Sequence, residues 1–264
     1  MNSHKSPRTN TPDHPLAFGI DIGGSGIKGA PVDLATGEFA QERHRIATPQ
    51  PSTPRAVAEV VHELVDAYDL PTEVPIGVAF PAPIHHGVIR FIANLDQSWT
   101  GVDLPALLAQ ETGRRVVGIN DADAAGVGEV RYGAARDAQG VVLVATLGTG
   151  IGSALLVDGT IVPNTELGHL EIDGFDAETR AADSARSRED LSWEEWAGRL
   201  QRYFGVVEDL LSPDLIVIGG GVSKHHEKFL PLLHLRAPVV PATLRNAAGI
   251  VGAAAHAAGG SQLA

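Results

Sequence analysis

Apolar positions in the first part of the chain follow two different periods. Residues 16–22, LAFGIDI, form a short apolar run that ends in glycines, which predicts a buried strand. Residues 53–70 carry apolar side chains at helical spacing, with Thr53 and Pro54 at the cap and the first turn, so they predict a helix. The change of period indicates a chain that mixes strands and helices.

The alternation of strand and helix continues along the chain and predicts an α/β architecture. Residues 138–157 are uncharged over about the length of a membrane span, but their four glycines and β-branched bias favour two buried strands around a turn. The other predicted strands are 74–80, 116–120 and a strand within 214–223 that ends in glycines, and the other predicted helices are 103–113, 121–133 and 192–211.

The glycines after the first strand raise the question of a dinucleotide site. Gly24, Gly26 and Gly29 match the spacing G-x-G-x-x-G, but that fingerprint requires a helix directly after the turn. Here the residues after the turn predict a second strand that contains Pro31, a turn at 35–37 and a third strand. A dinucleotide-binding oxidoreductase is therefore only a remote alternative.

The pattern of the first glycine turn returns later in the chain. Residues 144–158, VATLGTGIGSALLVD, align without gaps on residues 19–33 at an offset of 125. Both segments read as an apolar strand, a glycine turn and a second apolar strand. We expect two similar halves, each of which offers backbone N–H groups to an anion in the cleft between them.

Composition narrows the classes of function. The chain has 264 residues, 44% of them hydrophobic, which is typical of a globular protein. Its formal net charge of −12 argues against nucleic acid or an anionic membrane as a partner. It contains no cysteine, so disulfides and thiolate zinc sites are excluded.

Five ordered motifs resemble the ROK family of sugar kinases, which belongs to the hexokinase and actin-like superfamily. They are DIGGSGIKGA, IND, LGTGIGSAL, ELGH and IVIGGGVS. Three longer segments are more closely similar to the polyphosphate glucokinases of actinobacteria, some of which also accept ATP and mannose. These segments are SWEEWAGRL, SPDLIVIGGGVSKHHEKFLPLL and VVPATLRNAAGIVGAA, and the resemblance covers residues 16–257.

The resemblance implies a two-lobed actin-like or hexokinase-like fold, built as a duplicated ribonuclease H-like unit with the active site in the cleft. We expect an N-terminal lobe over 16–120 and a C-terminal lobe over 121–258, with a disordered leader at 1–15 and a flexible tail at 259–264. The implied reaction is phosphoryl transfer from polyphosphate, ATP or both, with magnesium, to the 6-hydroxyl of glucose or mannose. A cytoplasmic homodimer that binds neither nucleic acid nor membrane is also implied.

The motif IND contains the residue to which the resemblance gives the central role. It implies that Asp121 is the general base that takes the proton of the sugar hydroxyl, with Asn120 as a hydroxyl partner. The alternative is that Asp121 only caps the following helix, a position that Asp favours. Asp123, two residues further on, is expected to point elsewhere on the helix.

Other residues are expected to hold the sugar. Glu166 and His169 lie three apart in ELGH, which places them on one side of a helical segment. A carboxylate and an imidazole together supply the acceptor and donor that neighbouring hydroxyls need. The resemblance adds Asn94, in NLDQSW, and leaves open whether Glu171 or Glu178 makes a further contact.

The donor site is expected at the glycine turns. Asp21 follows the first strand, and the resemblance implies that it orients magnesium through water; the alternative is a turn residue that bonds its own backbone. Glycines let the main chain approach phosphate closely. The expected donor-binding residues, besides Asp21, are Gly23, Gly24, Ser25, Gly26, Lys28, Gly148, Thr149, Gly150, Gly219, Gly220 and Gly221.

Two questions about the donor and the activity stay open at this point. The family also includes ATP-only kinases and sugar-responsive repressors, although the repressors carry an N-terminal helix-turn-helix domain. A polyphosphate donor requires a basic track that leads out of the cleft, and the sequence does not place its cations on one face. The candidates are Arg43, Arg45, Arg90, Arg114, Arg115, Arg131 and Lys224.

Overall fold

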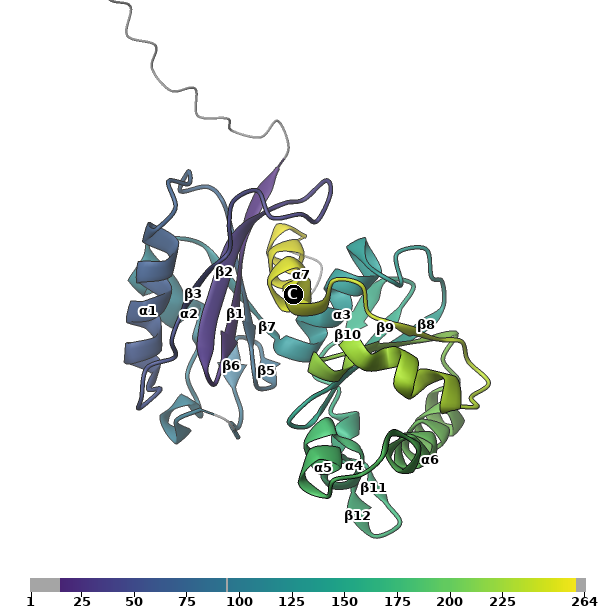
Figure 1. Ribbon diagram of the computed structural model, residues 1–264. Coiled ribbons are helices and arrows are strands. Elements are labelled where there is room, and N and C mark those ends of the chain that lie inside the picture. The colour runs from purple at the N-terminus through teal and green to yellow at the C-terminus, as the bar shows by residue number, and fades with distance from the viewer. Residues whose placement is uncertain (1–14, 94, 260–264) are drawn as a thin grey trace, which may run out of the picture.

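Two five-stranded sheets form the framework of the protein. A computed structural model describes residues 15–93 and 95–259; the remainder of the expected leader and tail, and Asn94, lie outside the described residues. The first sheet, purple to blue in Figure 1, has the order β3-β2-β1-β4-β7. β3, β2 and β1 pair antiparallel, and β4 and β7 add in parallel. Its strands are β1 (Leu16–Gly23), β2 (Gly26–Asp33), β3 (His44–Ile46), β4 (Ile76–Phe80) and β7 (Val116–Asn120).

The second sheet repeats the topology of the first. Its order is β10-β9-β8-β13-β14, again with an antiparallel meander followed by two parallel strands. β8 and β9 start at Val141 and Ile151, and β1 and β2 start at Leu16 and Gly26, so both pairs keep the predicted offset of 125. This confirms the internal repeat. The strands are β8 (Val141–Leu147), β9 (Ile151–Val157), β10 (Thr160–Val162), β13 (Leu215–Gly219) and β14 (Val239–Pro241).

Helices cover both sheets and fill the space between them. α1 (Pro54–Asp66) and α2 (Leu104–Thr112) lie on one face of the first sheet, where they bury the core around Ile20, Leu64 and Trp99. The second sheet packs on a core that contains Trp196 and Phe204 of α6, and the ring of Trp193 lies against that of Trp196. The helices on this side are α4 (Ala177–Ala181), α5 (Asp183–Arg188) and α6 (Trp193–Leu211).

Short elements connect the sheets and helices. One hairpin lies beside β7, and another follows a 3-10 helix in the second half. The hairpin strands are β5 (Ile84–His85), β6 (Val88–Ile89), β11 (Glu171–Ile172) and β12 (Phe175–Asp176). The 3-10 helices are η1 (Gln97–Trp99), η2 (Leu167–His169), η3 (Gly221–Lys228), η4 (Leu230–Leu232) and η5 (Arg245–Ala247).

Most predicted elements are confirmed, but the third strand of the first sheet lies elsewhere. The residues after the turn at 35–37 make a single bridge, between Val32 and Phe39, and β3 begins only at His44. Pro31 accepts a hydrogen bond from the Ala40 N–H but has no N–H of its own to return, so the ladder cannot continue there. The uncharged run 138–157 forms β8 and β9 as expected, and none of the described helices is long and apolar enough to cross a membrane.

α7 (Ala248–Ala258) packs between the first sheet and α3 (Asp121–Tyr132), as Figure 1 shows. Glycines bring the backbones into direct contact. A Cβ at Gly19 of β1 would meet the carbonyl of Ile250, and a Cβ at Gly77 of β4 would meet that of Ala253. Gly252 of α7 lies in the same way against α3. The position of α3 is therefore set by backbone contacts that leave no space for side chains.

We expect the substitution Gly77→Ala to lower the free energy of unfolding by about 3 kcal/mol, because the added methyl group must displace the backbone of α7. Gly205→Ala in α6 is the matched control, since nothing lies within 4 Å of its added Cβ. That variant should gain about 0.5–1 kcal/mol from helix propensity. Urea denaturation of both variants tests the contact, and similar stabilities for the two would contradict it.

Candidate active site

A cavity of about 740 Å³ lies between the two glycine turns. Its lining comes from the β1–β2 turn, the β8–β9 turn, the start of α3 and the region of η2. A second cavity of about 210 Å³ adjoins it and shares Asp121, Ala122, Thr146 and Gly220. Elements that lie far apart in the sequence thus meet at one polar site.

The two glycine turns face this cavity with their backbones. Gly23, Gly24 and Ser25 line it from the first sheet, and Gly148, Thr149 and Gly150 line it from the second. Ser184 at the start of α5 holds the second turn, because its Oγ donates to the Thr149 carbonyl over 2.6 Å. β2 follows the first turn directly, so the strand–turn–helix context of a dinucleotide fingerprint is absent here.

Asp121 sits where β7 ends and α3 begins. Asn120, not Asp121, caps the helix: its Oδ1 accepts from the N–H groups of Ala122 and Asp123 over 2.9 and 3.1 Å. The cap occupies the oxygen of Asn120 and leaves its amide nitrogen for a ligand. Asp121 lines both cavities, and the helix therefore presents its carboxylate to them.

The pKa of Asp121 is raised to about 6. Loss of hydration is the main cause, and the charges of Asp21 and Glu166 also raise the pKa, whereas backbone hydrogen bonds from Ala122 and from Asp121 itself lower it. A carboxyl group that exchanges its proton near neutral pH is suited to general base catalysis.

Asp21 lies opposite Lys28 in the β1–β2 ladder, and the Lys28 Nζ is 3.4 Å from its Oδ2. Both residues line the smaller cavity together with Asp121. Three acidic residues, Asp21, Asp121 and Glu129, and two cationic ones, Lys28 and Arg245, therefore border the same space.

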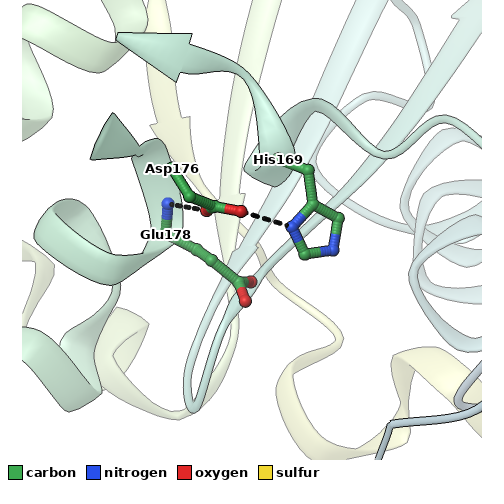
Figure 2. A group of neighbouring side chains, drawn as sticks. All are labelled: His169, Asp176 and Glu178. Atoms are coloured by element: carbon green, nitrogen blue, oxygen red, sulfur yellow. Dashed lines mark hydrogen bonds and ion pairs between the residues drawn. The ribbon is translucent and has the colours of Figure 1, made fainter. Parts of the chain in front are cut away.

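Glu166 and His169 both line the larger cavity, at the two ends of the ELGH motif. Gly168 between them lies against the backbone of Ile151, where a Cβ has no space. Figure 2 shows that the Nδ1 of His169 pairs with Oδ2 of Asp176 at 2.9 Å, and this hydrogen bond raises the pKa of His169. Nε2 remains available to a ligand. Burial raises the pKa of Glu166, and the nearby His169 offsets this in part.

Of the two glutamates left open as a further sugar contact, only Glu178 borders the larger cavity. Glu178 lines the larger cavity, and its Oε2 accepts from the Ile151 N–H over 3.1 Å; Glu171 does not line it. His169, Asp176 and Glu178 bring ligand atoms within 4.8 Å of one another. The hydrogen bonds already use an oxygen of each carboxylate, so we interpret the three as a hydrogen-bonded group (Figure 2).

The remaining predicted site residues are distributed around these cavities. Gly219 lines the smaller cavity and Gly220 lines both, whereas Gly221 and Gly26 line neither. Asn94 lies outside the described residues, although Ala93 beside it contributes to the larger cavity.

Comparison with known proteins places this site in a family. The model of the ROK family matches residues 17–186. The chain belongs to the ROK family.

Individual relatives agree with this assignment. The polyphosphate glucokinase of Mycobacterium tuberculosis is 47% identical over 251 residues, which are 95% of this chain and 93% of that protein. The solved inorganic polyphosphate/ATP-glucomannokinase of an Arthrobacter strain is 56% identical, with a TM-score of 0.86 over 91% of this chain and 97% of that one. A ROK glucokinase from Streptomyces griseus, solved with glucose and AMPPNP, has a TM-score of 0.77 at 23% identity over 93% of this chain and all of that one. The expected two-lobed sugar-kinase fold is thereby confirmed.

One set of hydrogen bonds in this ROK protein, made by Asn164, is not predicted from the sequence. Asn164, which follows β10, pairs its side chain with the backbone of Ile84 in β5, accepting over 2.8 Å and donating over 3.0 Å. Its own N–H donates to Oδ2 of Asp123 over 2.7 Å. These contacts join β5 of the first half to α3 of the second half. The only sequence signal is the turn-forming pair Pro163 and Asn164.

Asp123 therefore lies away from the cavity and inside the protein, as expected from its place on the helix. Its side chain is buried, and its Oδ1 has no partner among the described residues. Burial is the main reason that its pKa is raised to about 7, and the charges of Glu166 and Asp121 contribute to the shift. Between pH 4 and pH 7 this carboxyl group is therefore protonated in the folded protein and loses its proton when the protein unfolds.

A raised pKa makes the folded state lose stability as pH rises. We expect the free energy of unfolding to include a contribution from Asp123 that falls by roughly 2–4 kcal/mol between pH 4 and pH 7. Asp123→Asn should remove this slope, because the amide stays neutral and still accepts from Asn164. Urea denaturation at stepped pH checks this, with Asp137→Asn on the exposed surface as control. Equal slopes for Asp123→Asn and the wild type would show that Asp123 is ionised throughout.

Proposed function

We propose that the protein transfers a phosphoryl group from polyphosphate, ATP or both to the 6-hydroxyl of glucose, and also of mannose. One observation carries the proposal: a carboxylate with a pKa near 6, Asp121, lies between two glycine turns and beside Glu166. The names of the relatives at 47% and 56% identity support the same donor and acceptor classes. A protein that only sensed sugar would have no use for such a base.

The sugar would lie on the Glu166 side of the larger cavity. Glu166 accepts from one hydroxyl, and His169 offers its Nε2 to a neighbouring one, held in place by Asp176 on Nδ1. The amide nitrogen of Asn120 donates to a third. Asp121 then takes the proton of the hydroxyl that attacks, in line with the donor phosphorus. Glu178 and Asn94 are included in the proposal as further sugar contacts.

The donor phosphates would lie between the two turns. Backbone N–H groups of Gly24 and Ser25 on one side, and of Thr149 and Gly150 on the other, would bind their oxygens. Gly219 and Gly220 leave space for the part of the donor beyond the phosphates. In phosphoryl transfer such positioning and charge stabilisation supply most of the catalysis.

Asp21 and Asp121 fit a magnesium ion, because two carboxylates border one cavity and the charge of Asp21 raises the pKa of Asp121. Asp21 would hold the ion, mainly through water. When bound, magnesium neutralises the oxygens of the donor. Lys28, whose Nζ lies 3.4 Å from Oδ2 of Asp21, would orient that carboxylate toward the cavity.

The division into lobes 16–120 and 121–258, the homodimer and the cytoplasmic location are parts of the same proposal. They rest on the resemblance to polyphosphate glucokinases. The use of both glucose and mannose is also part of the proposal, since the two sugars differ only in the orientation of one hydroxyl group.

We expect Asp121→Asn to lower kcat by about 10²–10⁴-fold, the usual contribution of a general base. Glucose should still bind, because Glu166 and His169 remain. A coupled assay for glucose 6-phosphate with magnesium and either donor measures the first effect, and calorimetry measures the second. Asp137→Asn serves as the control for a neutralised surface carboxylate. Full activity of Asp121→Asn would remove Asp121 from the mechanism.

The activity should also depend on pH through Asp121. A general base must be ionised, so kcat/KM should fall as pH decreases through about 6, with no such limb in the residual activity of Asp121→Asn. Initial rates at constant ionic strength between pH 5 and pH 8 provide the test. A limb near the ordinary value of an aspartic acid would contradict the raised pKa.

A further inference from the structure

A row of polar side chains leads from the reaction centre to the edge of the first sheet. In the antiparallel ladder Asp21 lies opposite Lys28, and Lys28 lies opposite Arg45 of β3. Directly opposed residues project from the same face of a sheet. The three side chains therefore form one line across β1, β2 and β3, on the face that α7 partly covers.

Two further arginines extend this line. Arg43 precedes Arg45 by two residues, and its Nη1 donates to the carbonyl of Asn246 over 3.4 Å. Arg245, next to Asn246, lines the smaller cavity together with Lys28. We call Lys28, Arg43, Arg45 and Arg245 the basic strip. It begins inside the cavity that Asp121 lines and continues onto the surface.

The described arginines differ in whether they form ion pairs with carboxylates. Among the described residues, six arginines form ion pairs with carboxylates, but Arg43, Arg45 and Arg245 do not. The acidic residues that line the cavity with Lys28 and Arg245 are Asp21, Asp121 and Glu129. The Glu129 carboxylate already accepts hydrogen bonds from the N–H groups of Ala134, Thr243 and Leu244. In a protein with a net charge of −12, three arginines left without carboxylate partners beside the reaction centre favour an anionic ligand.

The other basic candidates from the sequence lie elsewhere. Arg114 donates to the carbonyls of Leu70 and Pro71, and Arg131 to that of Ala255, and none of these acceptors lines a cavity. By contrast, Arg45 donates to the carbonyl of Ser25, which lines the larger cavity, and Arg43 to that of Asn246, which lines the smaller one. Within the described residues, Arg90, Arg115 and Lys224 neither line a cavity nor form a side-chain hydrogen bond with a residue that does. The structure thus selects two of the seven candidates, Arg43 and Arg45, and adds Lys28 and Arg245.

We infer that the basic strip binds the distal phosphates of a long polyphosphate donor, with its reacting end between the glycine turns. This rests on the proposed function. A nucleotide ends in an uncharged base, so it gains little from cations beyond the cavity. A phosphate chain carries charge along its whole length, and each unit that leaves the cavity meets another cation of the strip.

The test compares polyphosphates of two lengths on the variant Arg43→Gln/Arg245→Gln. Loss of the two charges, of which that of Arg43 is half-buried and that of Arg245 exposed, should raise the Kd of long-chain polyphosphate about tenfold at low ionic strength. Tripolyphosphate, which is short enough to stay near the turns, and ATP should lose less affinity than the long chain does, because only Arg245 of the two arginines lines the cavity. Added salt should reduce the difference between variant and wild type, because it screens exposed charges. Arg55→Gln on α1, over the opposite face of the sheet, is the matched control.

Two readouts separate this inference from the proposed function. Binding is measured by calorimetry without glucose, and turnover is measured by the coupled assay with each donor. Unchanged long-chain affinity in the double variant, or an equal loss for tripolyphosphate and ATP, overturns the basic strip even if the wild type uses polyphosphate. Wild-type turnover with ATP alone overturns the polyphosphate donor, whereas a length-dependent loss of binding in the variant still supports the strip as a polyanion site.

Discussion

The active site depends on the close backbone packing of α7 against the first sheet and α3. Gly19, Gly77 and Gly252 let main-chain atoms meet where a methyl group has no space. The start of α3, and with it Asp121, is held at a fixed distance from β1, which carries Asp21. Both carboxylates border one cavity because this three-layer contact permits little adjustment. A looser helix pair would place Asp121, the proposed base, and the first glycine turn independently of each other.

Electrostatics at the site follow from the same packing. Asp121, Asp123 and Glu166 are brought together in a partly dehydrated region, and each has a raised pKa. Concentrated acids are an unusual surrounding for anionic substrates. In the proposed mechanism, backbone N–H groups at both turns and the cations that begin at Lys28 compensate for these acids. The proposed proton acceptor is then separated from the proposed anion-binding groups over a short distance.

Much of this arrangement could be predicted from the sequence, because it is recorded in local patterns. The strands around both glycine turns, the repeat offset of 125 and the helix that begins at Asp121 all follow from periodicity and turn residues. Contacts made by side chains across the fold leave no such trace. The pairing of Asn164 with Ile84 and that of His169 with Asp176 depend on how loops meet in space. β3 was misplaced because the missing donor of Pro31 outweighs strand propensity.

The packing of α7 also bears on how the chain is made. One apolar face of β1 is covered by α7, at residues 248–258, which follows the whole of the second sheet in the sequence. During synthesis β1 must therefore wait, with that apolar face uncovered, until nearly all later residues have left the ribosome. The second sheet with α6 has its partners close in sequence and can assemble earlier. The half that is synthesised first thus completes its folding last. Until then its strands are exposed, and chaperones would be needed there.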